Sequence, residues 1–261
     1  MKRTHFFIII FSLLVALTIF LDYKDEIFSY HDILVEFHGL IFDLFFLGII
    51  LALYESYREK KDKTERYKEE IDDFRKWQSE EAKYKIAGNI RRLYDLGVTE
   101  FNLNHCYLND EDLMEYNFTN SSFAFSDLES ASFSRSILNN CTFVGSNLKK
   151  VFCVEAMANN ANFENVDLSS STLTRCDFSN SNFRKANLKG AKICGTDFNN
   201  ADMRFANLKN VKVYDENWLE TLRLNNVKGI EKLIEKYQIK SESLDRDEIG
   251  EFWIVTKKNS T

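Results

Sequence analysis

Apolar residues recur at every fifth position between residues 103 and 213. This spacing matches neither the helix period of 3.6 residues nor the strand period of 2, so no single helix or strand keeps these residues on one face. A chain that buries all of them has to turn once per repeat. The spacing predicts a repeat core made of Leu103, Leu108, Leu113, Phe118, Phe123, Leu128, Phe133, Leu138, Phe143, Leu148, Phe163, Leu168, Leu173, Phe178, Phe183, Leu188, Ile193, Phe198, Met203 and Leu208.

Two smaller residues, Cys153 and Ala158, interrupt this series of large side chains. Phe152 and Met157 each precede one of them by a single position. We predict a local bulge that turns one of the larger residues inward. The alternative is one slimmer layer that packs without distortion.

A small residue stands two positions before most of the core residues, and turn-forming residues follow them. The small positions include Ser121, Ala131, Cys141, Ala161 and Ala186, and Asn, Asp, Ser and Gly are frequent between repeats. One large and one small inward residue per short segment, followed by turn residues, is typical of a tightly wound parallel solenoid.

Several units match one five-residue motif almost completely, namely Ala161-Asn162-Phe163, Ala186-Asn187-Leu188, Ala201-Asp202-Met203 and Ala206-Asn207-Leu208. The stretch resembles the pentapeptide-repeat family, whose motif is written A(D/N)LXX, and the resemblance covers residues 99–213. It implies a mainly β domain, a right-handed quadrilateral parallel β-helix with about twenty residues per coil. Five to six coils stacked about 4.8 Å apart would make a rod about 27 Å long.

The pattern of residues 1–55 predicts a transmembrane hairpin. Residues 6–21 and 33–53 are apolar stretches that would contact membrane lipid, and the second is about 30 Å long as a helix, enough to cross a bilayer. The loop between them is acidic, whereas positive charges flank the outer ends of the pair. By the positive-inside rule we predict a multi-pass protein of the bacterial inner membrane with both termini in the cytoplasm.

The second apolar stretch contains an acidic residue, Asp43, far from either of its ends. In an antiparallel hairpin its depth matches that of Thr18, which offers a hydroxyl partner. An acid inside a membrane is a candidate functional residue. The alternatives are a role in packing the hairpin or an oligomer, and a shifted span that places Asp43 close to water.

Residues 56–98 predict a charged helical stalk followed by a cap helix. The stalk continues the second span, and Tyr67, Ile71, Phe74 and Trp77 form one apolar stripe. This stripe allows either a coiled coil, which would make a homo-oligomer, or one amphipathic helix that packs on the solenoid or on the membrane. Residues 86–98 predict a short helix that covers the open end of the first coil.

The pattern of residues 214–261 predicts a small α+β cap at the C-terminal end of the solenoid. A helix carries Trp218, Leu219 and Leu222, and a second helix lies around residues 229–237. Residues 239–244 and 251–256 predict two paired strands. The alternative is a partner-binding module that uses Trp253.

Charge is distributed unevenly along the repeats. Residues 109–130 carry six acidic residues and no Lys or Arg, whereas most charged residues from 175 to 212 are basic. We find no motif for a catalytic triad, a phosphate loop, a dinucleotide site or a metalloprotease. Four of the five cysteines occupy inward positions, so we expect no metal, no cofactor and no enzymatic activity.

The predicted function is a non-catalytic scaffold, tethered to the membrane, that presents the β-helix to an unidentified protein partner. The resemblance also raises the alternative of an acidic rod that mimics DNA and inhibits or protects an enzyme such as gyrase. The basic half of the rod argues against this, so nucleic-acid mimicry and nucleic-acid binding are not expected. A membrane-active protein that works through Asp43 is the third alternative.

Overall fold

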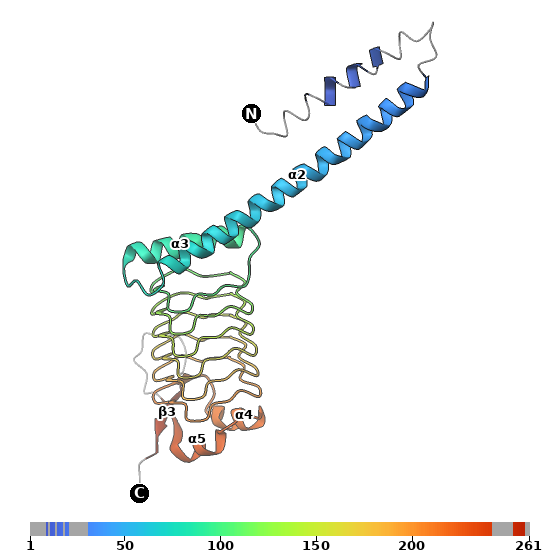
Figure 1. The fold of residues 1–261 in the computed structure, drawn as a ribbon. Helices are drawn as coiled ribbons and strands as arrows, with labels where there is room; N and C mark the ends of the chain where they lie inside the picture. Colours follow the sequence, from blue (N-terminus) through green and yellow to red (C-terminus); the bar gives the residue numbers. More distant parts are fainter. Residues whose placement is uncertain are drawn as a thin grey trace. The chain divides into compact units, whose positions relative to one another are not determined.

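The computed structural model describes residues 9, 11–13, 15–17, 19, 20, 31–241 and 253–258 (Figure 1). The chain divides into two compact units, Met1–Arg66 and Tyr67–Thr261. In the first unit the described residues between 9 and 20 are helical, and α2 (His31–Asp73) begins there and ends in the second unit. The rings of Phe11 and Phe45 lie 5.1 Å apart, so the two helical segments of the first unit are in contact.

The apolar part of α2 has few neighbours in the structure. Among the described residues one helix, over His38–Asp73, is long and apolar enough to cross a membrane, judged by length and composition. Its large side chains are exposed, with Phe42 at 63%, Ile50 at 60% and Leu53 at 66%. The helix runs on without a break into the charged residues of the predicted stalk. Residues 9, 11–13, 15–17, 19 and 20 of the predicted first span, residues 6–21, are helical, and the span as a whole stays a prediction.

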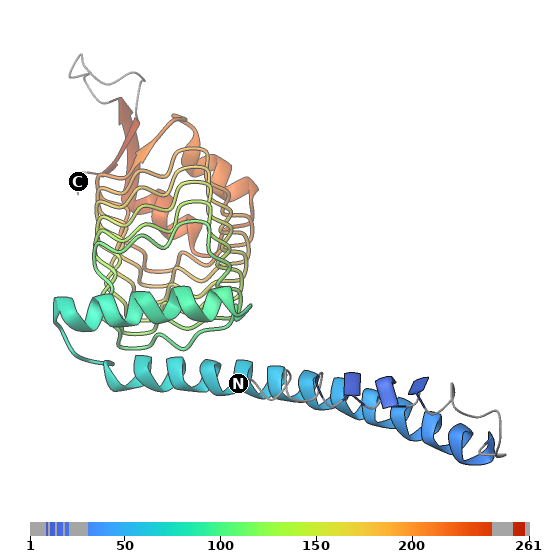
Figure 2. The same ribbon diagram turned by 90° about the horizontal axis from the view of Figure 1, so that it is seen from above.

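The second unit is built around stacked coils of twenty residues. Parallel bridges join one residue of each five-residue repeat to the residue twenty positions later, from Asn102 and Ser122 to Lys192 and Lys212. The backbone amide of Leu103 donates to the oxygen of Ser122 at 2.7 Å, and that of Ser122 donates to the oxygen of Phe101 at 2.8 Å. Each five-residue repeat therefore forms one side of a coil, and Figure 2 shows the coils superimposed when seen from above.

The apolar residues of the repeat fill the inside of the coils. Every predicted core residue between positions 103 and 208 is at most 3% exposed. Because the coils are in register, residues twenty apart form columns that run along the stack. One column consists only of leucine, and another stacks phenylalanine rings with centroids 4.8 to 5.0 Å apart; they are Leu108, Leu128, Leu148, Leu168, Leu188 and Leu208, and Phe123, Phe143, Phe163 and Phe183.

The chain turns at one fixed position of each repeat. The residue two after each core residue has a φ between 55° and 71° at every repeat from 105 to 210. This left-handed conformation costs most side chains about 1 to 2 kcal/mol and costs Gly and Asn less. Accordingly, one column of turns is asparagine throughout, and within it Asn140 donates to the side chain of Asn120 at 3.0 Å; its members are Asn120, Asn140, Asn160, Asn180 and Asn200.

The predicted bulge at Cys153 and Ala158 is wrong, and the slimmer layer is what the structure contains. Cys153 and Ala158 face inward at 6% and 0% exposure, whereas Phe152 and Met157 face outward at 49% and 48%. The backbone amides of Cys153 and Ala158 both donate to the next coil at 2.8 Å. The register is set by these backbone hydrogen bonds, which are indifferent to side-chain volume.

A helix covers the first coil, as the sequence predicts, although it begins six residues earlier than expected. Helix α3 (Glu80–Asp95) starts at Ser79, whose hydroxyl accepts from the amide of Ala82 at 3.2 Å. Its buried face packs in the same cluster as the core of the first coil through Ile86, Ile90 and Leu93. Figures 1 and 2 show α3 lying across this end of the stack.

The other end is closed by α4 (Trp218–Leu224), α5 (Ile230–Lys236) and a three-stranded antiparallel sheet. The strands are β1 (Lys212–Val213), β2 (Tyr237–Ser241) and β3 (Trp253–Lys257), in the order β1-β3-β2. Hydrogen bonds from the cap satisfy backbone groups of the last coil. Val255 accepts from the amide of Asn210 at 2.7 Å, Lys228 accepts from that of Met203 at 3.0 Å, and the Tyr237 hydroxyl accepts from that of Leu208 at 3.2 Å.

The predicted cap helices and paired strands are confirmed, with strand β2 starting two residues earlier than expected. Trp218 is buried at 7% exposure and its ring lies 6.5 Å from that of Phe198, whereas Trp253 is half-buried. Both pack against the core, which favours the cap over a separate partner-binding module that uses Trp253.

Candidate docking surface

The outward-facing columns of the rod carry whatever function the repeats have, because the inward positions are filled by packed apolar side chains. Residues twenty apart are neighbours on this surface, so charges separated by one coil can pair. Arg135 binds Glu115 at 2.5 Å, and Arg175 binds Glu155 at 2.9 Å. This column alternates in sign along the rod and has little net charge.

The acidic end of the rod is partly neutralised within the protein. Burial under α3 raises the pKa of Glu111, and the cations Lys83 and Arg91 oppose that rise. Glu129 binds Lys150 at 2.9 Å, a hydrogen bond that lowers the pKa of Glu129. The acidic residues that stand out in the sequence thus serve in part to hold the cap helix and the neighbouring coil.

The basic end differs, because part of its charge has no partner. Arg184 binds Glu164 at 4.0 Å and Arg204 binds Asp202 at 2.5 Å. Within the part of the chain that the structure describes, six exposed lysines form no ion pair; they are Lys185, Lys189, Lys209, Lys228, Lys232 and Lys236. An excess of positive charge therefore remains at this end of the rod.

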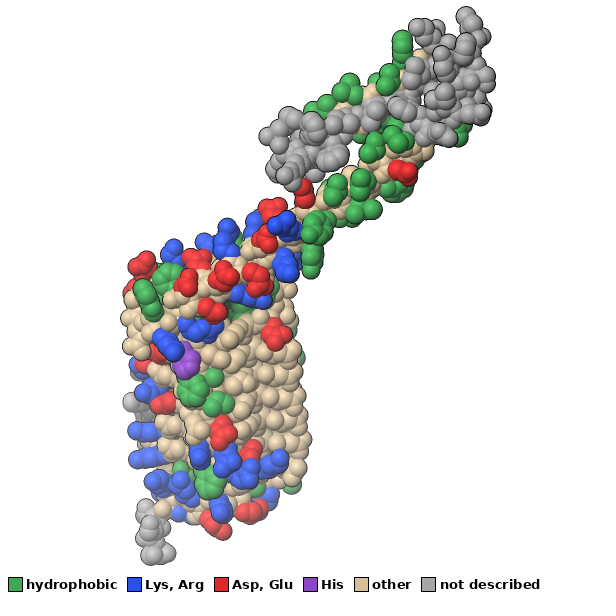
Figure 3. All heavy atoms as spheres, viewed as in Figure 1, with side chains coloured by type: hydrophobic (Ala, Val, Ile, Leu, Met, Phe, Trp, Pro, Cys, Tyr) green, Lys and Arg blue, Asp and Glu red, His purple; other side chains and the backbone are tan. Residues whose placement is uncertain are grey.

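Two of these lysines, Lys232 and Lys236, line a cleft between the last coil and α5, which we call the Phe205 cleft. Lys228 is next to Gly229 of its lining, and Lys185 lies one coil before Phe205 in the same column. The cleft has a volume of about 590 Å³ and is lined by Arg204, Phe205, Ala206, Val227, Gly229, Ile230, Glu231, Lys232, Leu233 and Lys236. Its floor is apolar, because Ala206, Val227 and Leu233 are at most 3% exposed. Figure 3 shows Lys and Arg side chains gathered around exposed hydrophobic side chains at this end of the coils.

Two phenylalanines occupy the left-handed turn position of the same column, and both are exposed, Phe125 at 59%. Their ring contacts differ. Phe125 stacks on His105 with ring centroids 5.3 Å apart, and a Cβ added at Gly145 would lie 2.7 Å from its ring. Phe205 is 66% exposed. Among the described residues its ring has one cation or ring contact, with the Lys232 ammonium, 6.0 Å from the ring centre. The exposed ring of Phe205 is therefore available for binding.

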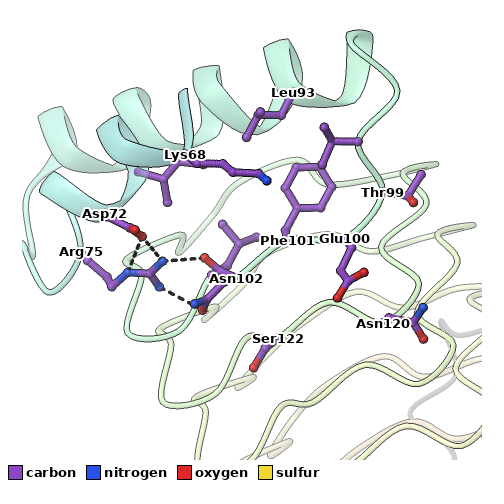
Figure 4. Close-up of a pocket in the computed structure, with 13 residues that line it drawn as sticks. Lys68, Asp72, Arg75, Leu93, Thr99, Glu100, Phe101, Asn102, Asn120 and Ser122 are labelled. Atoms are coloured by element: carbon purple, nitrogen blue, oxygen red, sulfur yellow. Dashed lines mark hydrogen bonds and ion pairs between the residues drawn. The ribbon is translucent and has the colours of Figure 1, made fainter. Parts of the chain in front are cut away.

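A second cleft, of about 560 Å³, lies between the end of α2, α3 and the first coil (Figure 4). Arg75 occupies its edge and donates to the backbone oxygens of Asn104 at 2.6 Å and Asn102 at 2.8 Å, and it also binds Asp72. Figure 4 shows the Lys68 side chain reaching from α2 towards Phe101. Because Arg75 serves to attach α2 to the open edge of the first coil, we assign this cleft to the cap.

The candidate polar site in the membrane segment is only partly described. Asp43 is exposed on α2 between large apolar residues, whereas Thr18 lies outside the described residues. Their predicted pairing stays a prediction. Among the described residues there is no cluster of three or more His, Cys, Asp or Glu side chains that could hold a metal ion.

The five cysteines are buried free thiols, and we expect them to resist alkylation in the folded protein. Burial raises the pKa of Cys106, Cys141 and Cys176 to about 12 and that of Cys194 to about 11, and it also raises the pKa of Cys153. At pH 8 the reactive thiolate is therefore scarce. Iodoacetamide should label all five thiols in urea and none within the same time in buffer, as read by mass spectrometry. Fast labelling of one cysteine in buffer would show that its coil opens.

The sequence does not predict the Phe205 cleft, because α5 approaches the coils only in three dimensions. A signal was nevertheless present. A bulky aromatic residue is costly at a turn position that favours Asn and Gly, and Phe205 occupies such a position beside Lys185 and Arg204.

A protein-family model described as pentapeptide repeats matches eight copies over residues 102–135, 126–165, 136–175, 161–200 and 176–213. No curated protein sequence matches the chain. A pentapeptide-repeat protein from the cyanobacterium Cyanothece is 19% identical, with 53% of this chain and 97% of that chain covered and a TM-score of 0.33.

Two further solved structures are similar at the same level. HetL, a pentapeptide-repeat protein involved in heterocyst differentiation regulation in the cyanobacterium Nostoc, is 22% identical, with 48% of this chain and 84% of that one covered and a TM-score of 0.24. Full-length QnrB1, a plasmid-mediated fluoroquinolone resistance protein, is 13% identical, with 48% and 88% covered and a TM-score of 0.18. Likenesses this distant say nothing about the function of this chain.

Proposed function

This chain belongs to the pentapeptide-repeat family through residues 102–213, and we propose that it is a non-catalytic scaffold, tethered to a membrane by α2, that docks an acidic protein at the basic end of its rod. Proteins of this family adopt a right-handed quadrilateral β-helix. Such a rod offers surface and no deep interior site, which suits docking better than catalysis.

The tether rests on the exposed apolar face of α2. Phe42, Phe46 and Ile50 are between 58% and 63% exposed, which is unlike the core helix of a soluble protein. The basic residues that follow the apolar part, from Arg58 to Lys63, favour a cytoplasmic location for the rod. We propose the bacterial inner membrane as its place, with the termini in the cytoplasm.

The observation that carries the docking function is the uncompensated charge around the Phe205 cleft. Lys185, Lys228 and Lys236 are exposed and have no ion pair within the described residues, whereas part of the acidic end of the rod faces cations of α3 and of neighbouring coils. A positive patch attracts an acidic partner and raises its rate of association.

The structure gives no support to the alternative of an acidic rod that mimics DNA. That alternative needs a continuous acidic column along the rod, and one highly charged column alternates between Glu115, Arg135, Glu155 and Arg175.

For the alternative that acts through Asp43, replacing Asp43 with Asn should abolish function while membrane targeting and folding stay intact.

Crosslinking in cells tests the scaffold. The full-length protein should stay in the membrane fraction after a carbonate wash and should form a specific crosslink with an acidic protein. The double variant Lys232→Glu, Lys236→Glu should lose at least about ten-fold of this crosslink, because it reverses the charge that attracts the partner. The matched control Lys189→Glu, Lys209→Glu reverses two exposed lysines of the coils that do not line the cleft, and it should keep the crosslink.

Three results would contradict the proposal. Extraction of the full-length protein by carbonate would exclude the tether. Absence of any partner that depends on surface charge would exclude docking. Equal loss of the partner in both double variants would show that the charge of the basic end as a whole attracts the partner and that the lysines around the Phe205 cleft are not the docking site.

A further inference from the structure

We propose that the Phe205 cleft binds a segment of the acidic partner in which carboxylates flank one bulky apolar side chain. This inference rests on the docking function proposed above and names the chemistry that the docking site recognises. The apolar side chain would enter the cleft beside Phe205, and the carboxylates would meet the surrounding lysines.

The shape of the cleft favours a side chain as its occupant. Its volume of about 590 Å³ falls within the range of roughly 300 to 1,000 Å³ that is usual for ligand sites. The lining combines the exposed ring of Phe205 with the buried side chains of Val227, Ile230 and Leu233, which belong to the floor. An apolar group that enters the cleft leaves water and gains contact with the ring of Phe205 and with the buried side chains.

Phe205 itself does little for the fold. It holds a left-handed φ of 66°, which is costly for a bulky residue, and it leaves two thirds of its surface in solvent. By contrast, Phe125 uses the same position to stack on His105. Exposed aromatic residues that the fold does not use are frequent among the residues that dominate binding energy.

The charges around the cleft specify the partner's sign. At its edge Arg204 pairs with Asp202, and Arg223 is shared between Glu231 and Glu220. Lys185 lies one coil before Phe205 in the same column, and its amide donates to the oxygen of Arg204 at 3.0 Å. Lys228, Lys232 and Lys236 follow on the cap. The remaining charge is therefore positive on both sides of the ring.

These features fit a peptide better than a nucleic acid or a lipid surface. Binding of single-stranded nucleic acid uses a series of aromatic platforms along a basic groove, and this cleft has one ring. Binding to a bilayer uses apolar side chains that protrude together, whereas the buried residues here form the floor of a hollow.

The test uses the purified full-length protein in nanodiscs and a fluorescent synthetic peptide with adjacent Leu and Trp residues flanked by runs of Glu. Fluorescence anisotropy gives the dissociation constant. Phe205→Ala should weaken binding by about ten-fold or more, whereas Phe125→Ala, a matched exposed Phe of the same column, should change it less than about two-fold. Lys232→Glu should weaken binding and reduce its dependence on salt.

Two control peptides separate the contributions. A peptide in which Ser replaces Leu and Trp keeps the charge and should bind at least about ten-fold more weakly, and a peptide with Lys in place of Glu should not bind. Equal binding of the Ser peptide, or equal effects of Phe205→Ala and Phe125→Ala, would overturn the proposal that the cleft binds an apolar side chain. Phe205-dependent binding of anionic vesicles or of a single-stranded oligonucleotide in place of the peptide would also overturn it.

Failure of this inference can be told from failure of the scaffold. If Phe205→Ala keeps the cellular crosslink that Lys232→Glu, Lys236→Glu loses, the basic end docks a partner without the cleft. If no variant changes any crosslink, the docking function itself is wrong.

Discussion

Replacing Phe163 with Ala should lower the free energy of unfolding of the repeat domain by about 3 to 5 kcal/mol. The ring of Phe163 is 3% exposed and lies between those of Phe143 and Phe183, at 5.0 Å and 4.8 Å, with Phe178 against its edge at 5.3 Å. Its removal leaves a cavity at the middle of this stack. Urea unfolding of the full-length protein in detergent, followed by circular dichroism, measures the loss.

The cavity should not collapse, because the backbone on both sides is fixed. The amide of Phe143 donates to Asn162 at 2.8 Å, and that of Phe163 donates to Asn182 at 2.7 Å. Two coils can therefore move together only if these ladder bonds lengthen. The cost should approach that of a cavity that keeps its volume.

Phe163→Leu is the control, because leucine fills the adjacent column along the whole rod. It should cost roughly 1 to 2 kcal/mol. Each coil contacts only its neighbours, so hydrogen exchange should increase most in the coils of Phe143, Phe163 and Phe183. Equal losses for the Ala and Leu variants, or a rise in exchange spread evenly over the rod, would contradict this account of the core.

The repeat domain could be predicted in detail because its structure is decided locally. Each repeat presents one large inward residue, one small residue and one turn, so the spacing alone identifies residues such as Leu108 and Phe183 as core. The same local reasoning failed at Cys153 and Ala158. At these two positions the sequence shows side chains smaller than those of the other repeats, which suggests a shift of register. The register is kept by hydrogen bonds between backbone groups of neighbouring coils, and these bonds do not depend on the side chains.

The charge of the surface was harder to predict, because it depends on which charged side chains form pairs in the folded protein. The acidic residues from 109 to 130 suggest a free acidic surface, yet Glu111 faces Lys83 and Arg91 from the cap helix. Pairs one coil apart, such as Glu115 with Arg135, follow from the sequence once the coil length is known. The Phe205 cleft does not, since α5 reaches the last coil only through the fold of the cap.

Replacing Gly229 with Ala should destabilise the C-terminal cap and close or distort the Phe205 cleft. An added Cβ would lie 2.7 Å from Cγ and 2.9 Å from Cα of Arg204, and the second of these atoms belongs to the backbone of the last coil. The φ of Gly229 is also +87°, where a side chain is strained. We expect a loss of about 2 to 4 kcal/mol in the free energy of unfolding, from strain and overpacking together.

Gly190→Ala separates these two causes. Gly190 has a similar φ of +71°, but a Cβ there would meet nothing closer than the hydroxyl of Ser170 at 3.7 Å. This variant should therefore show the strain alone, about 1 to 2 kcal/mol. The difference between the two variants in urea unfolding measures the steric contact between α5 and the last coil.

The steric contact should also have a local signature. Displacing residue 229 pulls on Lys228, whose amide donates to Ala201 at 2.8 Å and whose oxygen accepts from Met203 at 3.0 Å. Faster hydrogen exchange at these two amides is expected in Gly229→Ala and not in Gly190→Ala. If both variants lose the same stability and exchange alike, α5 can move away from Arg204 without cost. The walls of the Phe205 cleft would then not be fixed, and a cleft without fixed walls could not select one apolar side chain.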